Sequence, residues 1–410
     1  MKKEFALKIF EAFSIERWTD LVRPFEVVEM DKEAEKMVVA YIIAKFEESR
    51  GVKIDWEWMI YASLFHLLRK IQLCDIKAPV QTLIKQNFPE EYVKLNRWVL
   101  EQYRPYIDDD DLYAKFSTYI ESLGGNCALS EEQKAALHIF KAAHRYSTLR
   151  ELEMISPVNE SDRMEKIRRE LNAQLQGFLD LRGLQLLMTK QKPYEFLMRI
   201  EQLRFQTRWN QTPRVPATSV LGHCFFVAVL TLLLMRESPV KMCSRRIYNN
   251  FFSALFHDLP ESVTRDIISP VKQATDGLPE IVKKIEDQIV ASELVPLMED
   301  FYKNEILYFT SNEFDNRVIF DEKGFSVSFE KLNADYNYDE FEPVDGKLVR
   351  LADHYSALIE ADVSIHHGIT SRHLEDGRTN LINSYGSGTY INGIDAGSLF
   401  SQFLDRKSVV

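Results

Sequence analysis

The sequence predicts a mainly helical fold for its first half, because three stretches there space their apolar residues with a helical period. Residues 34–48, 56–71 and 131–146 each bring apolar side chains to one face of a helix. Between them, Gly124-Gly125-Asn126 indicates a loop, and the acidic run 108–111 indicates a turn or a helix start. Helices joined by short polar loops are therefore expected through this half.

Length and charge narrow the class of protein. A chain of 410 residues is too long for one ordinary core, so two domains are expected. Hydrophobic residues at 45% and charged residues at 28% are typical of a soluble globular protein. The net charge of −11 argues against a general nucleic-acid surface, which is usually basic, but it does not exclude a small anionic substrate.

Cysteine usage and the N-terminus indicate a cytoplasmic protein. The cysteines show no paired spacing that would predict a disulfide framework or a zinc motif (Cys74, Cys127, Cys224 and Cys243). Residues 1–7 lack the apolar core of a signal peptide, and the apolar run 225–235 is too short to span a bilayer. No membrane segment is predicted.

The two halves share a set of residues at a constant offset. Adding 191 to the number of each member of the first set reaches an identical residue in the second. An internal duplication of long period is the economical explanation. The matches are Phe5/Phe196, Ile9/Ile200, Arg17-Trp18/Arg208-Trp209, Arg23/Arg214, Leu64-Phe65-His66/Leu255-Phe256-His257, Asp75-Ile76/Asp266-Ile267 and Pro79-Val80/Pro270-Val271.

The second half carries the residues that suit a divalent cation. His257 and Asp258 are adjacent at the end of an apolar run, His223 opens the apolar stretch 225–235, and Asp353 lies downstream. Imidazole and carboxylate groups are suitable ligands for many divalent ions. Glu261 follows His257 by one helical turn, and Pro260 should kink or restart the helix there. Taken singly, each of these residues is more often a packed histidine, a helix cap or a surface charge.

The pattern His223, His257-Asp258 and Asp353, each on a separate apolar helix, resembles the HD-domain metal-dependent phosphohydrolases. Arg208-Trp209 before His223, and Glu261, Asp266 and 270–272 after the His-Asp pair, resemble the YfbR-like branch of 5′-deoxynucleotidases. The resemblance covers roughly residues 196–365. It implies an all-α fold of two tandem helical HD domains, with one divalent metal ion in the second.

The domain boundaries follow from this reading. Residues 1–155 are expected to form a degenerate HD-like domain, 156–192 a linker and connecting helix, and 193–410 the catalytic HD domain. Ser161 could cap a long amphipathic stretch over 163–188. An insert near 303–345 alternates with period two, which predicts a small β-hairpin. The Gly-rich tail is interpreted as a wrapping segment, and His366-His367 as structural or surface residues.

The first copy has lost most of the expected ligands. Lys32, Leu67 and His144 stand at the positions of His223, Asp258 and Asp353, and Lys70 stands at that of Glu261. Only His66 remains of the four ligands, and an ammonium group in their place repels a divalent cation. Residues 1–155 are therefore expected to keep the fold without the metal.

The resemblance also implies roles for the surrounding residues. Arg208 would bind the phosphate through its planar fork of donors, and Glu261 would act as general acid or base. Asp266 is implicated in catalysis and in binding the sugar 3′-hydroxyl, and Trp209 would line the deoxyribose. Glu261 could instead orient a ligand imidazole, and Trp209 could be a core tryptophan. The retention of Trp18, Arg17 and Asp75 in the first copy indicates that some of these residue types serve the fold.

The expected function is removal of the 5′-phosphate from deoxyribonucleoside monophosphates. Alternatives are hydrolysis of a deoxynucleoside triphosphate or of a cyclic or pyrophosphorylated nucleotide, and a non-catalytic nucleotide sensor or scaffold. The ion could be Mn, Co, Fe, Mg or Zn. Expected partners are a small nucleotide substrate and either an intramolecular pseudo-dimer or a homodimer, without a nucleic-acid polymer or a membrane.

Overall fold

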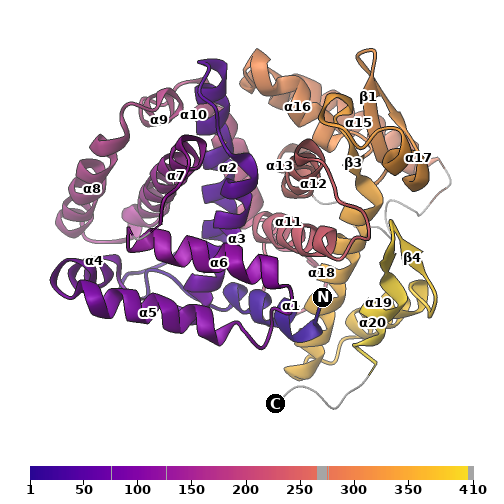
Figure 1. Cartoon of the computed structure of the whole chain (residues 1–410), viewed down its shortest axis with the longest axis horizontal. Coiled ribbons are helices and arrows are strands. Elements are labelled where there is room, and N and C mark those ends of the chain that lie inside the picture. The colour runs from indigo at the N-terminus through magenta and orange to yellow at the C-terminus, as the bar shows by residue number, and fades with distance from the viewer. Residues whose placement is uncertain (75, 126, 266–274, 276, 405–410) are drawn as a thin grey trace. The chain divides into compact units, whose positions relative to one another are not determined.

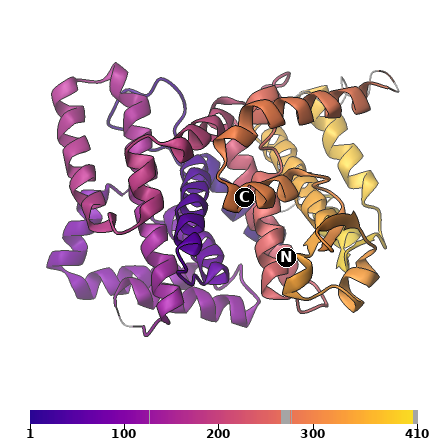
Figure 2. The same ribbon diagram turned by 90° about the horizontal axis from the view of Figure 1, so that it is seen from above.

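The computed structural model describes residues 1–74, 76–125, 127–265, 275 and 277–404. It divides into two compact units, one of Lys2–Leu184 and one of Gln185–Val410 together with Met1. Both views of the ribbon show helices joined by loops, with strands only in the second unit among the residues described (Figures 1 and 2). The all-α fold expected from the sequence is confirmed. Within the described ranges, none of the helices is both long and apolar enough to cross a membrane.

The first unit is built around a helix that is buried along nearly its whole length. This helix, α2 (Glu29–Ser49), packs against α3 (Trp56–Leu73) and α7 (Glu131–Ile155). Because α2 is buried on nearly every side, its charged side chains cannot reach solvent and must pair with other groups inside the unit. The other elements are α1 (Lys3–Phe10), η1 (Glu11–Phe13), α4 (Ala78–Asn87), α5 (Pro89–Gln102), α6 (Asp110–Leu123), η2 (Ser156–Val158), α8 (Ser161–Leu175) and η3 (Gln176–Phe178).

One sequence expectation for this region is wrong. Ser161 is the first residue of α8 and does not cap it, since Glu160 occupies the cap position without a side-chain hydrogen bond. The stretch 163–188 is not a continuous helix either. It is broken between α8 and α9 (Arg182–Met188), where η3 and a short turn intervene. The amphipathic pattern was correct on both sides of the break but did not reveal it.

The second unit is also built around a buried central helix, which here is apolar. Helix α11 (Val220–Arg236) is buried from Val220 to Met235 and packs against α12 (Ser244–Phe256) and α18 (Gly346–His366). The remaining helices are α10 (Lys192–Glu201), η4 (Gln202–Phe205), α13 (Glu261–Thr264), α15 (Leu278–Ile289), η5 (Val290–Leu294), η6 (Val295–Leu297), α16 (Asp300–Thr310), α17 (Phe329–Ala334), η7 (Asp339–Phe341), α19 (Arg372–Ser384) and α20 (Ala396–Ser401).

The hairpin expected in the insert is present. Strands β1 (Asn316–Phe320) and β2 (Lys323–Ser326) pair antiparallel, and β3 (Val344–Asp345) pairs with the other edge of β1, in the order β2-β1-β3. Helix α18 begins directly after β3. At its first residue, Gly346, a Cβ atom would lie only 2.2 Å from the carbonyl oxygen of Asp315, so glycine is required. The Gly-rich tail forms a smaller pair, β4 (Tyr390–Ile391) with β5 (Ile394–Asp395).

Candidate metal centre

Helix α11 buries His223 and orients its ring. The hydroxyl of Ser219 caps the helix by accepting from the Gly222 amide, and the His223 side chain is fully buried. Nδ1 of His223 lies 3.1 Å from Oγ of Ser356, whose hydroxyl donates to Oε1 of Glu360 at 3.2 Å. The Ser356 oxygen therefore accepts from Nδ1–H of His223. This leaves the Nε2 lone pair of His223, which is buried without a hydrogen-bond partner.

His257 presents its ring in the same way. It directly follows α12 as the C-cap residue, and its Nδ1 lies 2.7 Å from the carbonyl oxygen of Ala254. A carbonyl oxygen can only accept, so Nδ1 carries a hydrogen, and Nε2 is the nitrogen that faces the carboxylates. Nε2 of His257 lies 3.2 Å from Oδ2 of Asp258. Backbone or hydroxyl contacts of this kind fix the tautomer of imidazole ligands in metal proteins.

The structure brings the four residues expected as ligands together. Oδ1 of Asp353, on α18, lies 3.0 Å from Nε2 of His223, and Oδ2 of Asp258 lies 3.9 Å from the same nitrogen. The two imidazole rings are 5.4 Å apart between centroids. One donor atom each from His223, His257 and Asp353 fits within 4.8 Å of the others, a spacing that can hold a metal ion.

Electrostatics keep the two carboxylates ionised. Burial by itself would raise the pKa of Asp353, but the His223 contact and the charge of Arg208 outweigh it and hold that pKa below its ordinary value. Burial also opposes ionisation of Asp258, whose pKa is nonetheless lowered, chiefly by His257. Burial would lower the pKa of His257, but Asp258 raises it above its ordinary value, so a cation that binds at Nε2 of His257 would replace a proton there.

Arg208 faces both carboxylates with its Nη atoms, and Glu360 contacts its Nε. Its Nη1 lies 3.7 Å from Oδ2 of Asp258, its Nη2 lies 3.9 Å from Oδ1 of Asp353, and its Nε lies 3.3 Å from Oε1 of Glu360. Glu360 also pairs with Nη1 of Arg214 at 2.9 Å. Burial would lower the pKa of Arg208, but the surrounding carboxylates, Glu360 first, raise it above its ordinary value. The guanidinium is thus a fixed cation at the edge of the group.

Glu360 was missed by the sequence analysis. It is almost completely buried and contacts His223, Arg208 and Arg214 at once, while the Thr218 hydroxyl donates to its Oε2 at 2.8 Å. Burial would raise its pKa, yet Arg208 and the His223 contact hold it below the ordinary value. A useful signal was present, because Glu360 lies seven residues, or two helical turns, after Asp353 on the same helix face.

The positions of Trp209 and Glu261 do not by themselves indicate a role at the metal centre. Trp209 has a positive φ of 54°, its ring packs against α19 at Gly377, and its buried Nε1 has no hydrogen-bond partner. Helix α12 ends at Phe256, and Glu261 begins the separate short helix α13. Glu261 and His257 therefore do not lie on one continuous helix. The break occurs at Pro260, as the sequence indicated. Asp266 lies outside the described residues.

Cys224 is a second residue that sequence reasoning did not place at this site. Its Sγ, with His257 and Asp258, forms another group of closely spaced donor atoms. Burial raises the pKa of the Cys224 thiol, which disfavours the thiolate that a metal requires. The group with His223, His257 and Asp353 is therefore the better supported of the two.

In the first unit, the residues that the offset of 191 pairs with this centre make different contacts. Arg17 pairs with Glu151 and Glu29, and the Trp18 indole donates to Glu151 at 2.9 Å. Trp18 has a φ of 57°, close to that of Trp209. Lys32, at the position of His223, is fully buried, and its ammonium donates to the His144 carbonyl, Ser147 and Thr148.

Comparison with known proteins supports the assignment of the second unit. Residues 200–382 match the family model of the HD domain. These residues are similar to an HD domain. The matched range contains Arg208, His223, His257, Asp258 and Asp353, and domains of this family are generally metal-dependent hydrolases. No curated protein matches the chain.

The residues present fit a divalent ion. The buried Nε2 of His223 has no hydrogen-bond partner, and both imidazoles use Nδ1 for contacts on the far side of the ring. Two imidazole nitrogens with two carboxylates suit Zn, Mn, Co or Fe, and this donor set does not select among them. These residues could therefore hold a divalent ion in the region that matches the HD domain model.

Proposed function

We propose that the protein is a metal-dependent phosphomonoester hydrolase that removes the 5′-phosphate from deoxyribonucleoside monophosphates. One arrangement carries the proposal: two buried imidazoles and two carboxylates converge, and a guanidinium lies 3.7 Å and 3.9 Å from the carboxylates. A cation site beside a fixed arginine suits a phosphate dianion, which needs positive charge on more than one side. The deoxynucleotide preference rests on the family resemblance of the motifs.

The proposed ligands are His223, His257, Asp258 and Asp353. An ion bound there supplies Lewis acidity, which lowers the pKa of a water molecule and stabilises charge on phosphoryl oxygens. Ser356 and Glu360 hold the ring of His223, and the Ala254 carbonyl holds that of His257. These contacts keep both rings in the tautomer that presents Nε2 to the centre.

Arg208 would bind the phosphate. Glu360 engages its Nε, which leaves Nη1 and Nη2 directed toward Asp258 and Asp353. These two nitrogens can donate to two phosphate oxygens in a bidentate contact, which a lysine could not reproduce. Held in this way, the guanidinium loses little conformational freedom when the substrate binds.

The remaining roles follow the resemblance. Glu261 would protonate the 5′-oxygen as the phosphorus–oxygen bond breaks, or would accept a proton from the attacking water. A place for Trp209 beside the sugar rests on the resemblance alone, because its Nε1 is buried in the structure. Asp266 would accept from the 3′-hydroxyl. Together these residues would set the preference for a deoxyribose.

We also propose that the first unit is a duplicated, degenerate HD domain. Its support lies in shared local geometry at the offset of 191. Isolated β-bridges join Glu16 to Val28 and Thr207 to Ser219, and α2 and α11 begin at residues 29 and 220. A positive φ at both Trp18 and Trp209 is a further match, since tryptophan rarely adopts this conformation.

The test is phosphate release by metal-stripped protein that is resupplied with Mn²⁺ or Co²⁺. The panel contains deoxy- and ribonucleoside mono-, di- and triphosphates. We expect phosphate from deoxymonophosphates alone, and we expect Asp258→Asn to cost more than the about 10- to 100-fold that loss of an outer partner typically costs. Asp300→Asn is the matched control, because the Asp300 side chain is 94% exposed and pairs only across one helical turn with Lys303.

Other outcomes separate the alternatives. Turnover of triphosphates or of ribonucleotides would keep the metal centre and overturn the substrate. Bound metal without release from any nucleotide would overturn the enzymatic assignment and favour a nucleotide sensor or scaffold. Equal activity of Asp258→Asn and Asp300→Asn would remove Asp258 from the site.

A further inference from the structure

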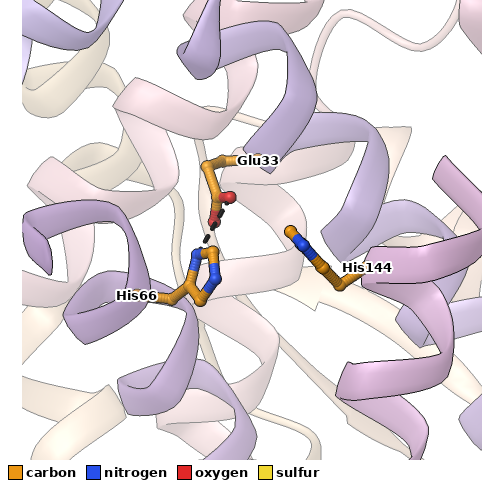
Figure 3. A group of neighbouring side chains, drawn as sticks. All are labelled: Glu33, His66 and His144. Carbon is orange, nitrogen blue, oxygen red and sulfur yellow. Dashed lines mark ion pairs between the residues drawn. The ribbon is translucent and has the colours of Figure 1, made fainter. Parts of the chain in front are cut away.

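The first unit contains its own group of side chains with donor atoms suited to a metal ion, which the sequence analysis did not find. Glu33 on α2, His66 on α3 and His144 on α7 converge in its interior (Figure 3). One donor atom from each lies within 4.8 Å of the other two. Oε1 of Glu33 is 3.1 Å from Nδ1 of His66, and the two imidazole rings are 5.1 Å apart between centroids. Two imidazoles and one carboxylate are a common donor set for Zn²⁺ and Fe²⁺.

The group uses a different combination of positions from the HD domain. His66 stands at the position of His257, and His144 stands at that of Asp353. Glu33 stands at the position of Cys224, because 33 plus 191 is 224. A carboxylate one residue after Lys32 thus replaces ligands that were lost at Lys32 and Leu67. The donor count falls from four to three, and the donor type stays the same.

Two atoms of the group are buried without a hydrogen-bond partner. These are Oε1 of Glu33 and Nδ1 of His144. Glu33 is completely buried, and an ionised carboxylate in such a place needs a cation close by. Unpartnered acceptor atoms in a closed interior indicate that the group is arranged around positive charge.

Lys36 supplies a positive charge at this point. Its side chain is completely buried, its ammonium donates to Oε2 of Glu33, and Nζ lies 2.9 Å from Nδ1 of His66. An ammonium can only donate, so Nδ1 of His66 accepts and its lone pair is directed at Lys36. Nζ also lies 4.3 Å from the centroid of the Phe140 ring. The same lone pair and the same carboxylate would bind a metal ion if the ammonium were absent.

We propose that Glu33, His66 and His144 form a second site for a divalent transition-metal ion, and that the Lys36 ammonium takes the place of that ion in the wild-type chain. An ion and an ammonium cannot share one carboxylate and one imidazole lone pair at this distance, because their charges repel and both need the same acceptors. The chain would thus carry its own cation where the HD domain binds a metal. This proposal does not depend on the substrate of the HD domain.

The test is the metal content of Lys36→Met. This variant removes the ammonium, keeps the volume of the side chain and leaves Glu33 without its partner. After dialysis against Zn²⁺, elemental analysis should find one more ion per chain in Lys36→Met than in the wild type. Co²⁺ should give the variant additional visible absorption from ligand-field transitions. The double variant Lys36→Met/His66→Ala should return to the wild-type content.

Lys32→Met is the matched control. Lys32 is equally buried on the same helix, but its ammonium donates to the His144 carbonyl, Ser147 and Thr148 and contacts none of the three donor groups. This variant should gain no ion. Equal metal content in Lys36→Met and wild type would overturn the proposal. So would a wild-type chain that already holds an ion sensitive to His66→Ala.

The folding of Lys36→Met provides an independent readout. Without metal, the buried Glu33 is unpaired, so the variant should melt at a lower temperature than the wild type. Zn²⁺ should restore the melting temperature in Lys36→Met and fail to restore it in Lys36→Met/His66→Ala. If Lys36→Met stays unfolded with Zn²⁺ as well as without it, the ion does not replace the ammonium and the proposal fails.

Discussion

At the scale of single residues, Glu360 is the support on which the metal centre depends. Its carboxylate contacts a ligand imidazole and the proposed phosphate-binding arginine together, at 3.4 Å from Nδ1 of His223 and 3.3 Å from Nε of Arg208. Glu360→Gln keeps the shape and removes the charge. Loss of such an outer contact typically lowers metal affinity or activity by about 10- to 100-fold, and we expect a loss in this range. Titration with Mn²⁺, read by phosphate release, measures both effects.

The control for Glu360→Gln is the same substitution on the surface. Glu322 lies exposed in the turn between β1 and β2, so Glu322→Gln should leave activity and metal affinity unchanged. If Glu360→Gln retained full activity and full affinity for Mn²⁺, the role of Glu360 in positioning His223 and Arg208 would be wrong.

The sequence identified some residues of this centre and missed others for a physical reason. His223, His257, Asp258 and Asp353 could be named because imidazole and carboxylate groups on apolar helices are chemically conspicuous. Glu360 at this centre, and Glu33 in the first unit, were not named, since a glutamate on a helix usually faces solvent. Their burial depends on which helices pack together, and only the three-dimensional structure gives that information.

At the scale of elements, a buried ion pair fixes α12 to the start of α18. Arg246 and Asp345 are both completely buried, with Nε to Oδ2 at 2.6 Å and Nη2 to Oδ1 at 2.7 Å. Asn250 and Asn392 donate to the same carboxylate. Arg246→Met would leave the buried Asp345 carboxylate without its charged partner. Breaking a buried pair in this way lowers the free energy of unfolding by about 3–5 kcal/mol. Denaturant unfolding of the second unit measures the loss.

An exposed arginine provides the comparison for Arg246→Met. The Arg372 side chain is 91% exposed and pairs with Asp376 one turn along α19. Arg372→Met should change the free energy of unfolding by no more than about 0.5 kcal/mol. A similar small effect for Arg246→Met would mean that Asp345 finds another partner or becomes protonated without cost.

The elements themselves were predictable to different degrees. The helices over 34–48, 56–71 and 131–146 and the hairpin of the insert followed from apolar period alone, and the structure contains them as α2, α3, α7 and β1–β2. The interruption between α12 and α13 was also indicated by Pro260. The break after α8 was not predicted, because it depends on tertiary packing, which a local pattern of apolar residues does not encode.

At the scale of the whole molecule, the two units should respond differently to metal. An ion at 100 times its dissociation constant stabilises the fold that binds it by about 2.7 kcal/mol. That fold is the unit Gln185–Val410, which contains the residues that match the HD domain model, whereas in Lys2–Leu184 the Lys36 ammonium contacts the proposed donor group. We expect chelation to increase amide hydrogen exchange in α11, α12 and α18 and to leave α2, α3 and α7 unchanged. Mass spectrometry of peptides from the intact chain, with and without chelator, measures this.

Asp258→Asn makes the same experiment selective, because it should abolish the response of α11, α12 and α18 to chelator without any effect on the first unit. Lys36→Met should add a response in α2, α3 and α7, where a bound ion would then link the three helices that carry Glu33, His66 and His144. A wild-type chain in which chelation loosens both units equally would contradict the assignment of the metal to one unit and the ammonium to the other. The distinction matters because it separates a cation that the cell must supply from one that the sequence encodes.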